Sequence, residues 1–180
     1  MLSWAHRPLV TAVAALHCLL LAPVAWSQPA PALRTLVGQT LSGRVTTVVD
    51  GDTVDVRLAA GSVIRVRLEG VDAPERGAPF SVQARTATRV ALFGQAVTLV
   101  ATDVDRYQRL VARVSANGRD SSLALVQAGL ACHFTRYSSD AALAAVQVSA
   151  RAEGRGFWVR GGQRPLTCDE ASAPAERLQQ

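Results

Sequence analysis

Carboxylates and arginines recur between residues 50 and 109 of this chain. They stand at 50–53 (Asp-Gly-Asp-Thr), at Arg67, at 71–75 (Val-Asp-Ala-Pro-Glu) and at 105–109 (Asp-Arg-Tyr-Gln-Arg). Carboxylates in turns at strand ends can hold a hard divalent cation through oxygen ligands, and a further carboxylate can activate water. Two arginines can clamp a phosphate and the charge that develops on it. The set predicts a metal-dependent phosphodiesterase.

The strands that must position these residues are indicated by alternating apolar side chains. Five strands are expected, at 41–49, 53–58, 63–69, 96–102 and 110–115. In the third, Ile64, Val66 and Leu68 face the core, which leaves Arg67 on the open face, where a ligand-binding side chain would stand. An Asp50-Gly51 turn joins the first two strands.

Three helices are expected between and after the strands, at 80–93, at 121–128 and from Ser138 or Ser139 to 152. On the first, one stripe carries the apolar residues at 82, 90 and 93 together with Thr86, and Asp120 is the expected N-cap of the second. Residues 71–79 read as a loop and 130–137 as extended chain. This element order predicts an α+β fold, a small five-stranded β-barrel of the OB type with three α-helices.

The first 27 residues have the features of a secretory signal peptide. Arg7 precedes an apolar run at 9–25, and small residues at Ala25 and Ser27 suit a cleavage site after Ser27. The alternative is an uncleaved membrane anchor, although the run is short for a span and is interrupted by His17 and Pro23. We expect a periplasmic or secreted monomer that has no stable membrane association once the leader is removed.

The predicted organisation is a leader at 1–27, a linker at 28–40, one domain at 41–158 and a flexible tail at 159–180. Arginine supplies all 19 basic residues of the chain, and the formal net charge is +5. Arginine offers a bidentate fork to phosphate and holds its charge at any working pH. A basic exported protein suits a polyanionic substrate, although an anionic surface would suit it equally.

Two cysteines, Cys132 and Cys168, remain after the leader is removed. In an oxidising compartment they could form a disulfide that ties the tail to the domain. The alternative is two independent thiols, because spacing alone does not fix the geometry.

Several of these segments resemble the staphylococcal nuclease (thermonuclease-like) family. The matching segments lie in order at 50–54, 67–68, 71–75, 107–109, 127–131 and 154–158. The resemblance spans roughly residues 41–158 and implies the same five-stranded OB-type barrel with three helices. It also implies calcium-dependent hydrolysis of phosphodiester bonds in DNA and RNA.

The resemblance implies a role for each matching residue. Asp52 and Asp72 would give carboxylate oxygens to Ca²⁺, and Ala73 would give its backbone carbonyl where many relatives have threonine. Glu75 would activate or orient the attacking water. Arg67 and Arg109 would bind the scissile phosphate and stabilise its developing charge.

Substrate contacts beyond the phosphate are also implied. Arg106 stands where relatives carry a basic residue, and Tyr107 and Tyr137 stand where aromatic rings flank the nucleotide. Thr135 replaces a second family tyrosine, and His133 is expected at the surface. Aromatic rings stack on unpaired bases without reading sequence, which favours broad specificity.

Two other readings stay open from the sequence. One is a catalytically inactive nucleic-acid-binding module of the OB type, although inactive relatives usually lose the metal ligands or arginines that this chain retains. The other is an envelope component that binds anionic polymers through its arginines.

Overall fold

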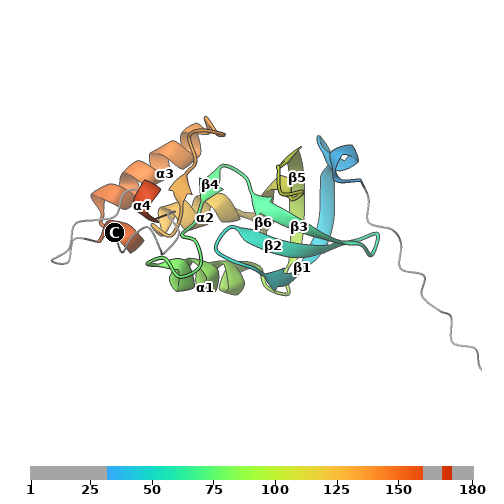
Figure 1. The fold of residues 1–180 in the computed structure, drawn as a ribbon, viewed down its shortest axis with the longest axis horizontal. Coiled ribbons are helices and arrows are strands. Elements are labelled where there is room, and N and C mark those ends of the chain that lie inside the picture. The colour runs from blue at the N-terminus through green and yellow to red at the C-terminus, as the bar shows by residue number, and fades with distance from the viewer. Residues whose placement is uncertain (1–31, 160–167, 172–180) are drawn as a thin grey trace, which may run out of the picture.

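A closed five-stranded barrel forms the body of the protein. The computed structural model describes residues 32–159 and 168–171 (Figure 1). The barrel strands are β1 (Thr40–Val48), β2 (Thr53–Leu58), β3 (Val63–Leu68), β5 (Ala96–Val104) and β6 (Leu110–Ala116). The expected leader, the beginning of the linker and most of the tail lie outside the described residues. The predicted OB-type barrel with helices is confirmed.

The strand order β3-β2-β1-β5-β6 is antiparallel throughout, and a parallel pairing of β3 with β6 closes the barrel. In that pairing Val66 lies opposite Leu110, and Arg67 lies opposite Val111. A short β7 (Arg119–Asp120) pairs antiparallel with the end of β6. Closure therefore brings the end of β3 beside the start of β6, two segments far apart in the sequence.

Alternation explains why these segments are strands. In β3 the side chains of Ile64, Val66 and Leu68 are buried, as predicted, and their neighbours face outward. The buried residues of β2, Val54, Val56 and Leu58, point into the same core. A half-buried strand with this period of two can bury only one face.

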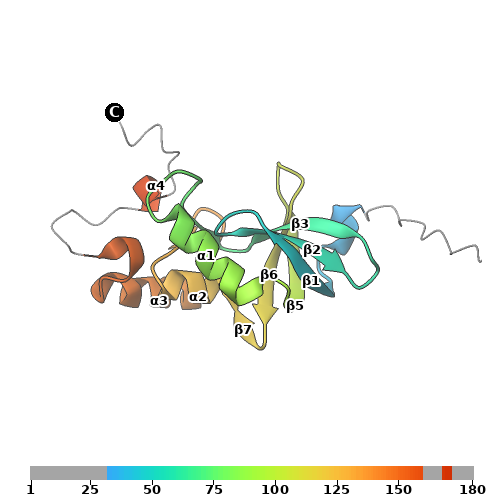
Figure 2. The same ribbon diagram turned by 90° about the horizontal axis from the view of Figure 1, so that it is seen from below.

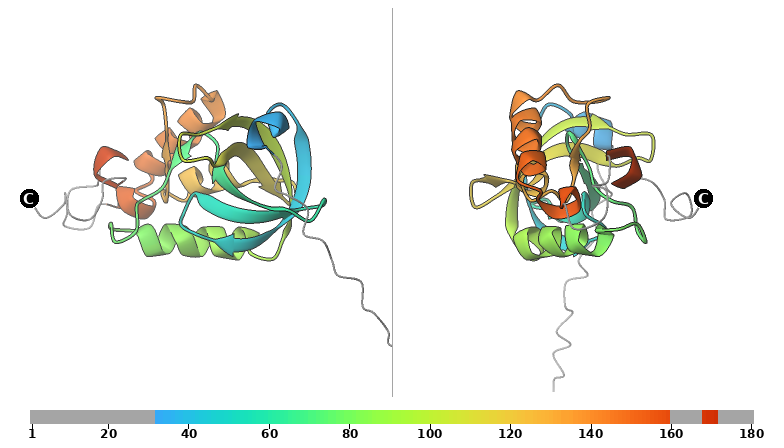
Figure 3. Two further views of the ribbon diagram at one scale, coloured as in Figure 1. Left: turned by 45° about the vertical axis from the view of Figure 1, so that its right-hand side comes forward. Right: turned by 90° about the vertical axis from the view of Figure 1, so that its left-hand side faces the viewer.

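The helices lie against one side and one end of the barrel (Figures 2 and 3). They are α1 (Ser81–Leu92), α2 (Ser121–Gln127) and α3 (Ala141–Ala152). The Asp120 side chain caps α2, as expected, by accepting a hydrogen bond from the Leu123 N–H. The cap of α3 is Asp140, and neither of the two predicted serines serves as the cap.

The predicted apolar stripe of α1 is wrong. Ala84, Thr88 and Leu92 face the core, whereas the side chains of Val82 and Val90 are 73% and 79% exposed. The reason is close packing: a Cβ atom added to Gly51 would lie only 2.8 Å from the Cβ of Ala84. The close approach of Ala84 and the hydrogen bond from the Thr88 hydroxyl to the Gly51 carbonyl decide which face of the helix meets the turn.

One segment expected to be a loop and one expected to be extended contain short strands. β4 (Val71–Asp72), in the predicted loop, pairs with β8 (Cys132–His133), in the segment expected to be extended. A 3-10 helix (Leu33–Leu36) lies within the expected linker, and Leu36 is buried against the barrel. The linker prediction thus fails at this apolar residue.

A disulfide ties residues 168–171 to the domain. Cys132 is bonded to Cys168 in a short α4 (Cys168–Ala171), with Cα atoms 5.7 Å apart. Phe157 and Trp158, in a 3-10 turn (Gly156–Trp158), pack against Cys132. Of the two alternatives left by the sequence, the structure has the disulfide. Among the described residues, none of the helices has the length and apolar character that a membrane crossing requires.

Candidate active site

The turn between β1 and β2 presents a buried carboxylate. Asp52 is only 3% exposed, and its oxygens accept hydrogen bonds from the Thr53 hydroxyl at 3.0 Å and the Ala73 N–H at 2.9 Å. Asp50 orders the turn by accepting a hydrogen bond from the Asp52 N–H. An Asp-Gly-Asp turn favours such local side-chain to backbone bonds. The carboxylate of Asp52 is thereby fixed in direction.

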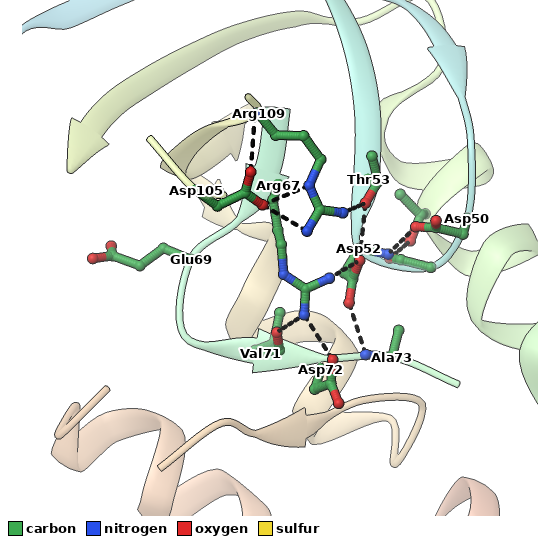
Figure 4. A network of polar contacts seen from close by, with 12 residues as sticks. Asp50, Asp52, Thr53, Arg67, Glu69, Val71, Asp72, Ala73, Asp105 and Arg109 are labelled. Carbon is green, nitrogen blue, oxygen red and sulfur yellow. Dashed lines mark hydrogen bonds and ion pairs between the residues drawn. The ribbon is translucent and has the colours of Figure 1, made fainter. Parts of the chain in front are cut away.

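Arg67 bridges two carboxylates that come from different elements. Its Nη1 donates to Asp52 at 2.7 Å, and its Nη2 donates to Asp72 at 2.6 Å and to the Val71 carbonyl at 3.1 Å (Figure 4). β4 reaches this position because it pairs with β8, which places Asp72 opposite Cys132. Arg67 therefore joins the β1–β2 turn to β4.

Arg109 lies on the other side of Thr53. Its guanidinium binds the Asp105 carboxylate at 2.7 Å from Nε, and its Nη1 donates to the Thr53 hydroxyl at 3.2 Å. Because the Thr53 hydroxyl in turn donates to Asp52, a continuous chain of hydrogen bonds runs from Arg109 to Arg67 (Figure 4). These hydrogen bonds can form because the pairing of β3 with β6 brings Arg109, which directly precedes β6, close to β2 and β3.

The electrostatics of the cluster are dominated by crowded acids. Burial raises the pKa of Asp52 to about 7, and Asp50 and Asp72 contribute to the increase, while Arg67 and the Ala73 N–H oppose it. Burial also acts to raise the pKa of Asp105, but hydrogen bonds from Arg109 outweigh it and the pKa lies below its ordinary value. Asp52, which pairs with Arg67, thus has a raised pKa, whereas Asp105, which pairs with Arg109, has a lowered pKa.

Glu75 follows β4 in an exposed loop. Its carboxylate makes no hydrogen bond or ion pair within the described residues, yet it lies inside the field of the cluster. Partial burial raises its pKa, with further contributions from Asp50 and Asp72, and Arg67 and Arg109 offset part of the effect. An unpaired carboxylate with a raised pKa has the character of a general base.

The donor chemistry fits a hard divalent cation. Asp50, Asp52 and Asp72 supply carboxylate oxygens, and their mutual repulsion is the kind of charge concentration that a cation relieves. In the described part of the chain, however, no three histidine, cysteine, aspartate or glutamate side chains lie close enough together to hold a metal ion. Arg67 forms ion pairs with one carboxylate oxygen of Asp52 and one of Asp72.

The structure brings together most of the predicted site residues. Five of them meet in one polar network: Asp52, Arg67, Asp72, Ala73 and Arg109. Arg106 and Tyr107 project from the adjacent β5–β6 loop, where the Arg106 guanidinium stands 4.8 Å from the centre of the Tyr107 ring. Their functional roles remain predictions.

Tyr137 and His133 lie apart from this network. Tyr137 is 75% exposed and contacts Phe134, with ring centres 5.0 Å apart. His133, expected at the surface, is buried, and its Nε2 lies 3.1 Å from the Ser138 hydroxyl. The surface expectation is wrong because pairing of β8 with β4 carries the histidine inward.

Sequence reasoning missed the supporting residues of the network. Thr53 belongs to the Asp-Gly-Asp-Thr segment, but only the structure reveals that its hydroxyl links the two arginines. Thr88 on α1 donates to the Gly51 carbonyl, and Arg85 donates to the Val48 carbonyl. No sequence motif marks these helical residues, because the burial of Thr88 is visible only in the structure.

Comparisons with known proteins find a matching family model and several similar sequences. The family model described as staphylococcal nuclease homologue matches residues 65–160. An uncharacterized endonuclease from Escherichia coli O157:H7 is 33% identical over 119 residues, covering 66% of this chain and 77% of that protein. A micrococcal nuclease from Shigella flexneri is 35% identical over 127 residues, covering 64% and 72%. Protein ParB from Escherichia coli is 31% identical over 161 residues, covering 83% and 84%.

Proposed function

The chain belongs to the staphylococcal nuclease family, and from this membership we propose that it is an exported, calcium-dependent nuclease. It hydrolyses phosphodiester bonds of DNA and RNA with little sequence specificity. The observation that carries the proposal is the pair of arginines, Arg67 and Arg109, linked through Asp52 and Thr53 beside the unpaired carboxylate of Glu75.

Both arginines keep donors for a phosphate. A guanidinium has five N–H groups. Asp52, Val71 and Asp72 take three from Arg67, and Asp105 and Thr53 take three from Arg109. Within the described residues, each arginine therefore has two N–H groups left. Donors held in place by carboxylates need no reorganisation as negative charge develops on the phosphate.

Glu75 takes the proton of the attacking water. Its raised pKa brings it closer to the working pH, at which a general base is most effective. Arg67 and Arg109 both act to lower the pKa of its carboxylate, which supports a common site for Glu75 and the two arginines.

Asp52 and Asp72 would hold the Ca²⁺, with the Ala73 carbonyl as a further ligand. When bound, the ion would neutralise part of the phosphate charge and supply Lewis-acid polarisation. Arg106, Tyr107 and Tyr137 would contact the rest of the nucleotide. The exposed rings of Tyr107 and Tyr137 suit stacking on unpaired bases.

Export is the second part of the proposal. The leader at 1–27 would be removed after Ser27, leaving a periplasmic or secreted monomer with no stable membrane association. The Cys132–Cys168 disulfide supports an oxidising compartment. Mass spectrometry of the protein recovered from periplasm or medium should find an N-terminus at Gln28.

The activity test uses protein beginning at Gln28, a circular plasmid and a labelled RNA, with Ca²⁺ titrated against EGTA. We expect calcium-dependent loss of both substrates. Glu75→Gln should lower the rate by orders of magnitude, and Glu153→Gln, which removes an exposed acid paired with Arg155, should not. Salt-dependent binding without cleavage at any Ca²⁺, Mg²⁺ or Mn²⁺ concentration would identify an inactive binding module instead.

A further inference from the structure

A polar cavity of about 260 Å³ lies beside the end of β3. Its charged lining consists of Glu69, Arg113, Asp120 and Asp140, and Tyr137 contributes an aromatic wall. Glu69 follows Arg67 by two residues, but its side chain points away from the Arg67 guanidinium (Figure 4). Glu69 directly follows the last residue of β3, so two residues of chain connect this cavity to Arg67 of the candidate active site.

Arg113 holds the acids of this cavity. Its guanidinium lies 2.6 Å from Asp140, 3.6 Å from Asp120 and 3.8 Å from Glu69. Asp120 and Asp140 also cap α2 and α3, so helix stability accounts for their presence. Glu69 caps neither helix, so helix stability does not account for its presence.

Among the three acids of this cavity, Glu69 has the least engaged carboxylate. Its carboxylate makes no hydrogen bond to the described residues, and the ion pair with Arg113 is long. Its backbone is fixed on both sides, because its N–H donates to the Ala112 carbonyl at 2.9 Å and its carbonyl accepts from the Ser122 hydroxyl at 2.8 Å. Both carboxylate oxygens can therefore receive donors from a ligand.

The charge of the cavity decides which part of a nucleic acid can enter. Three carboxylates surround one arginine, so a phosphate is repelled. An uncharged, flat group with N–H donors is favoured, and the size suits a base better than a whole nucleotide. The exposed ring of Tyr137, supported by Phe134, offers a stacking face.

We propose that this cavity is a nucleobase subsite in which Glu69 selects guanine over thymine or uracil. The inference rests on the proposed function and adds a base preference at one position of an otherwise broad substrate. Guanine carries adjacent N1–H and N2–H donors that match the two oxygens of a carboxylate. Thymine and uracil present one N–H between two carbonyl oxygens, which the acids would repel. Carboxylates read bases by accepting such donors.

The test measures binding without cleavage. Fluorescence anisotropy in EGTA compares a labelled thymidine hexanucleotide with six versions that each carry guanine at one position. Wild-type protein should bind one guanine version about tenfold more tightly, within the discrimination of a bidentate contact. Glu69→Gln should bring this ratio to about one, and the matched change Glu153→Gln should keep it.

Equal affinity for all hexanucleotides, or a guanine preference that Glu69→Gln retains, would overturn the subsite. Tyr137→Leu, at an exposed position that is safe for folding, should weaken binding of the preferred hexanucleotide. Repeating the series in Ca²⁺ separates the two proposals. Cleavage without base preference would refute the subsite and keep the nuclease, whereas guanine preference without cleavage would do the reverse.

Discussion

The Thr88 hydroxyl on α1 donates a hydrogen bond of 2.5 Å to the Gly51 carbonyl, in the turn that carries Asp52. Thr88 is buried, so this bond is shielded from water. It connects a helix that has no functional side chain in the network to the carboxylate that orients Arg67. The position of Asp52 thus depends on how α1 packs.

Replacing Thr88 with valine should therefore affect both stability and activity. The variant keeps the shape but leaves the Gly51 carbonyl unsatisfied, which should lower the free energy of unfolding by about 1–3 kcal/mol. A displaced Asp52 should also lower kcat. Urea unfolding and plasmid cleavage would measure the two effects, with exposed Thr86→Val as control. Equal values for both variants would contradict the role of Thr88.

Arg67→Lys should lower the cleavage rate by about 10²–10³. Lysine keeps the positive charge but cannot bridge Asp52 and Asp72 while donating to a phosphate. The matched control is Arg65→Lys, two residues earlier on the same face of β3, where the arginine pairs with Asp55. Single-turnover cleavage of a labelled oligonucleotide would measure both. Similar losses of rate in the two variants would contradict a specific role for the guanidinium geometry of Arg67.

Glu75→Gln should reduce the cleavage rate by about 10²–10⁴. In the wild type, activity requires ionised Glu75, so the rate should fall as pH falls through its pKa. Because burial and the neighbouring acids raise that pKa, the acid limb should lie above the ordinary glutamate value. A pH profile of kcat/KM, with Glu153→Gln alongside, would measure it. An acid limb at the ordinary value would count against Glu75 as the base.

Asp52 should make the metal-free protein less stable as pH rises. Its folded pKa of about 7 lies above the unfolded value. Between roughly pH 4 and 7 the folded state therefore binds more protons, and the free energy of unfolding falls as the proton is lost. Asp52→Asn removes this effect, so its stability relative to wild type should grow from pH 4 to 8. Urea unfolding in EGTA would test this, and a difference independent of pH would refute it.

Removing the Cys132–Cys168 disulfide should lower the free energy of unfolding by about 2–4 kcal/mol, because the bond closes a long loop. The Cys132→Ser, Cys168→Ser double variant should unfold at lower urea than the oxidised wild type. Reducing agent should shift the wild type toward the variant and leave the variant unchanged. Identical midpoints for oxidised and reduced wild type would contradict the prediction.

Local pattern was sufficient for the barrel strands and for the candidate ligands. Alternation in 63–69 placed Arg67 on the outward face, because a strand has a period of two and one face must be buried. The acidic turn at 50–53 and the carboxylates at 71–75 were identified by residue type alone. The ordered match to the family supplied the roles of Glu75 and Arg109.

Features that depend on packing between distant elements required the structure. Hydrophobicity chose the wrong face of α1, since Ala84 packs closely against the Gly51 turn and Thr88 donates a hydrogen bond to the Gly51 carbonyl. The link from Arg109 through Thr53 to Asp52 exists because β3 and β6 close the barrel. The burial of His133 and the cavity around Glu69 follow from how β8, α2 and α3 dock. Residue type and period are local properties of a chain, whereas closure and close approach are decided by the fit of whole surfaces.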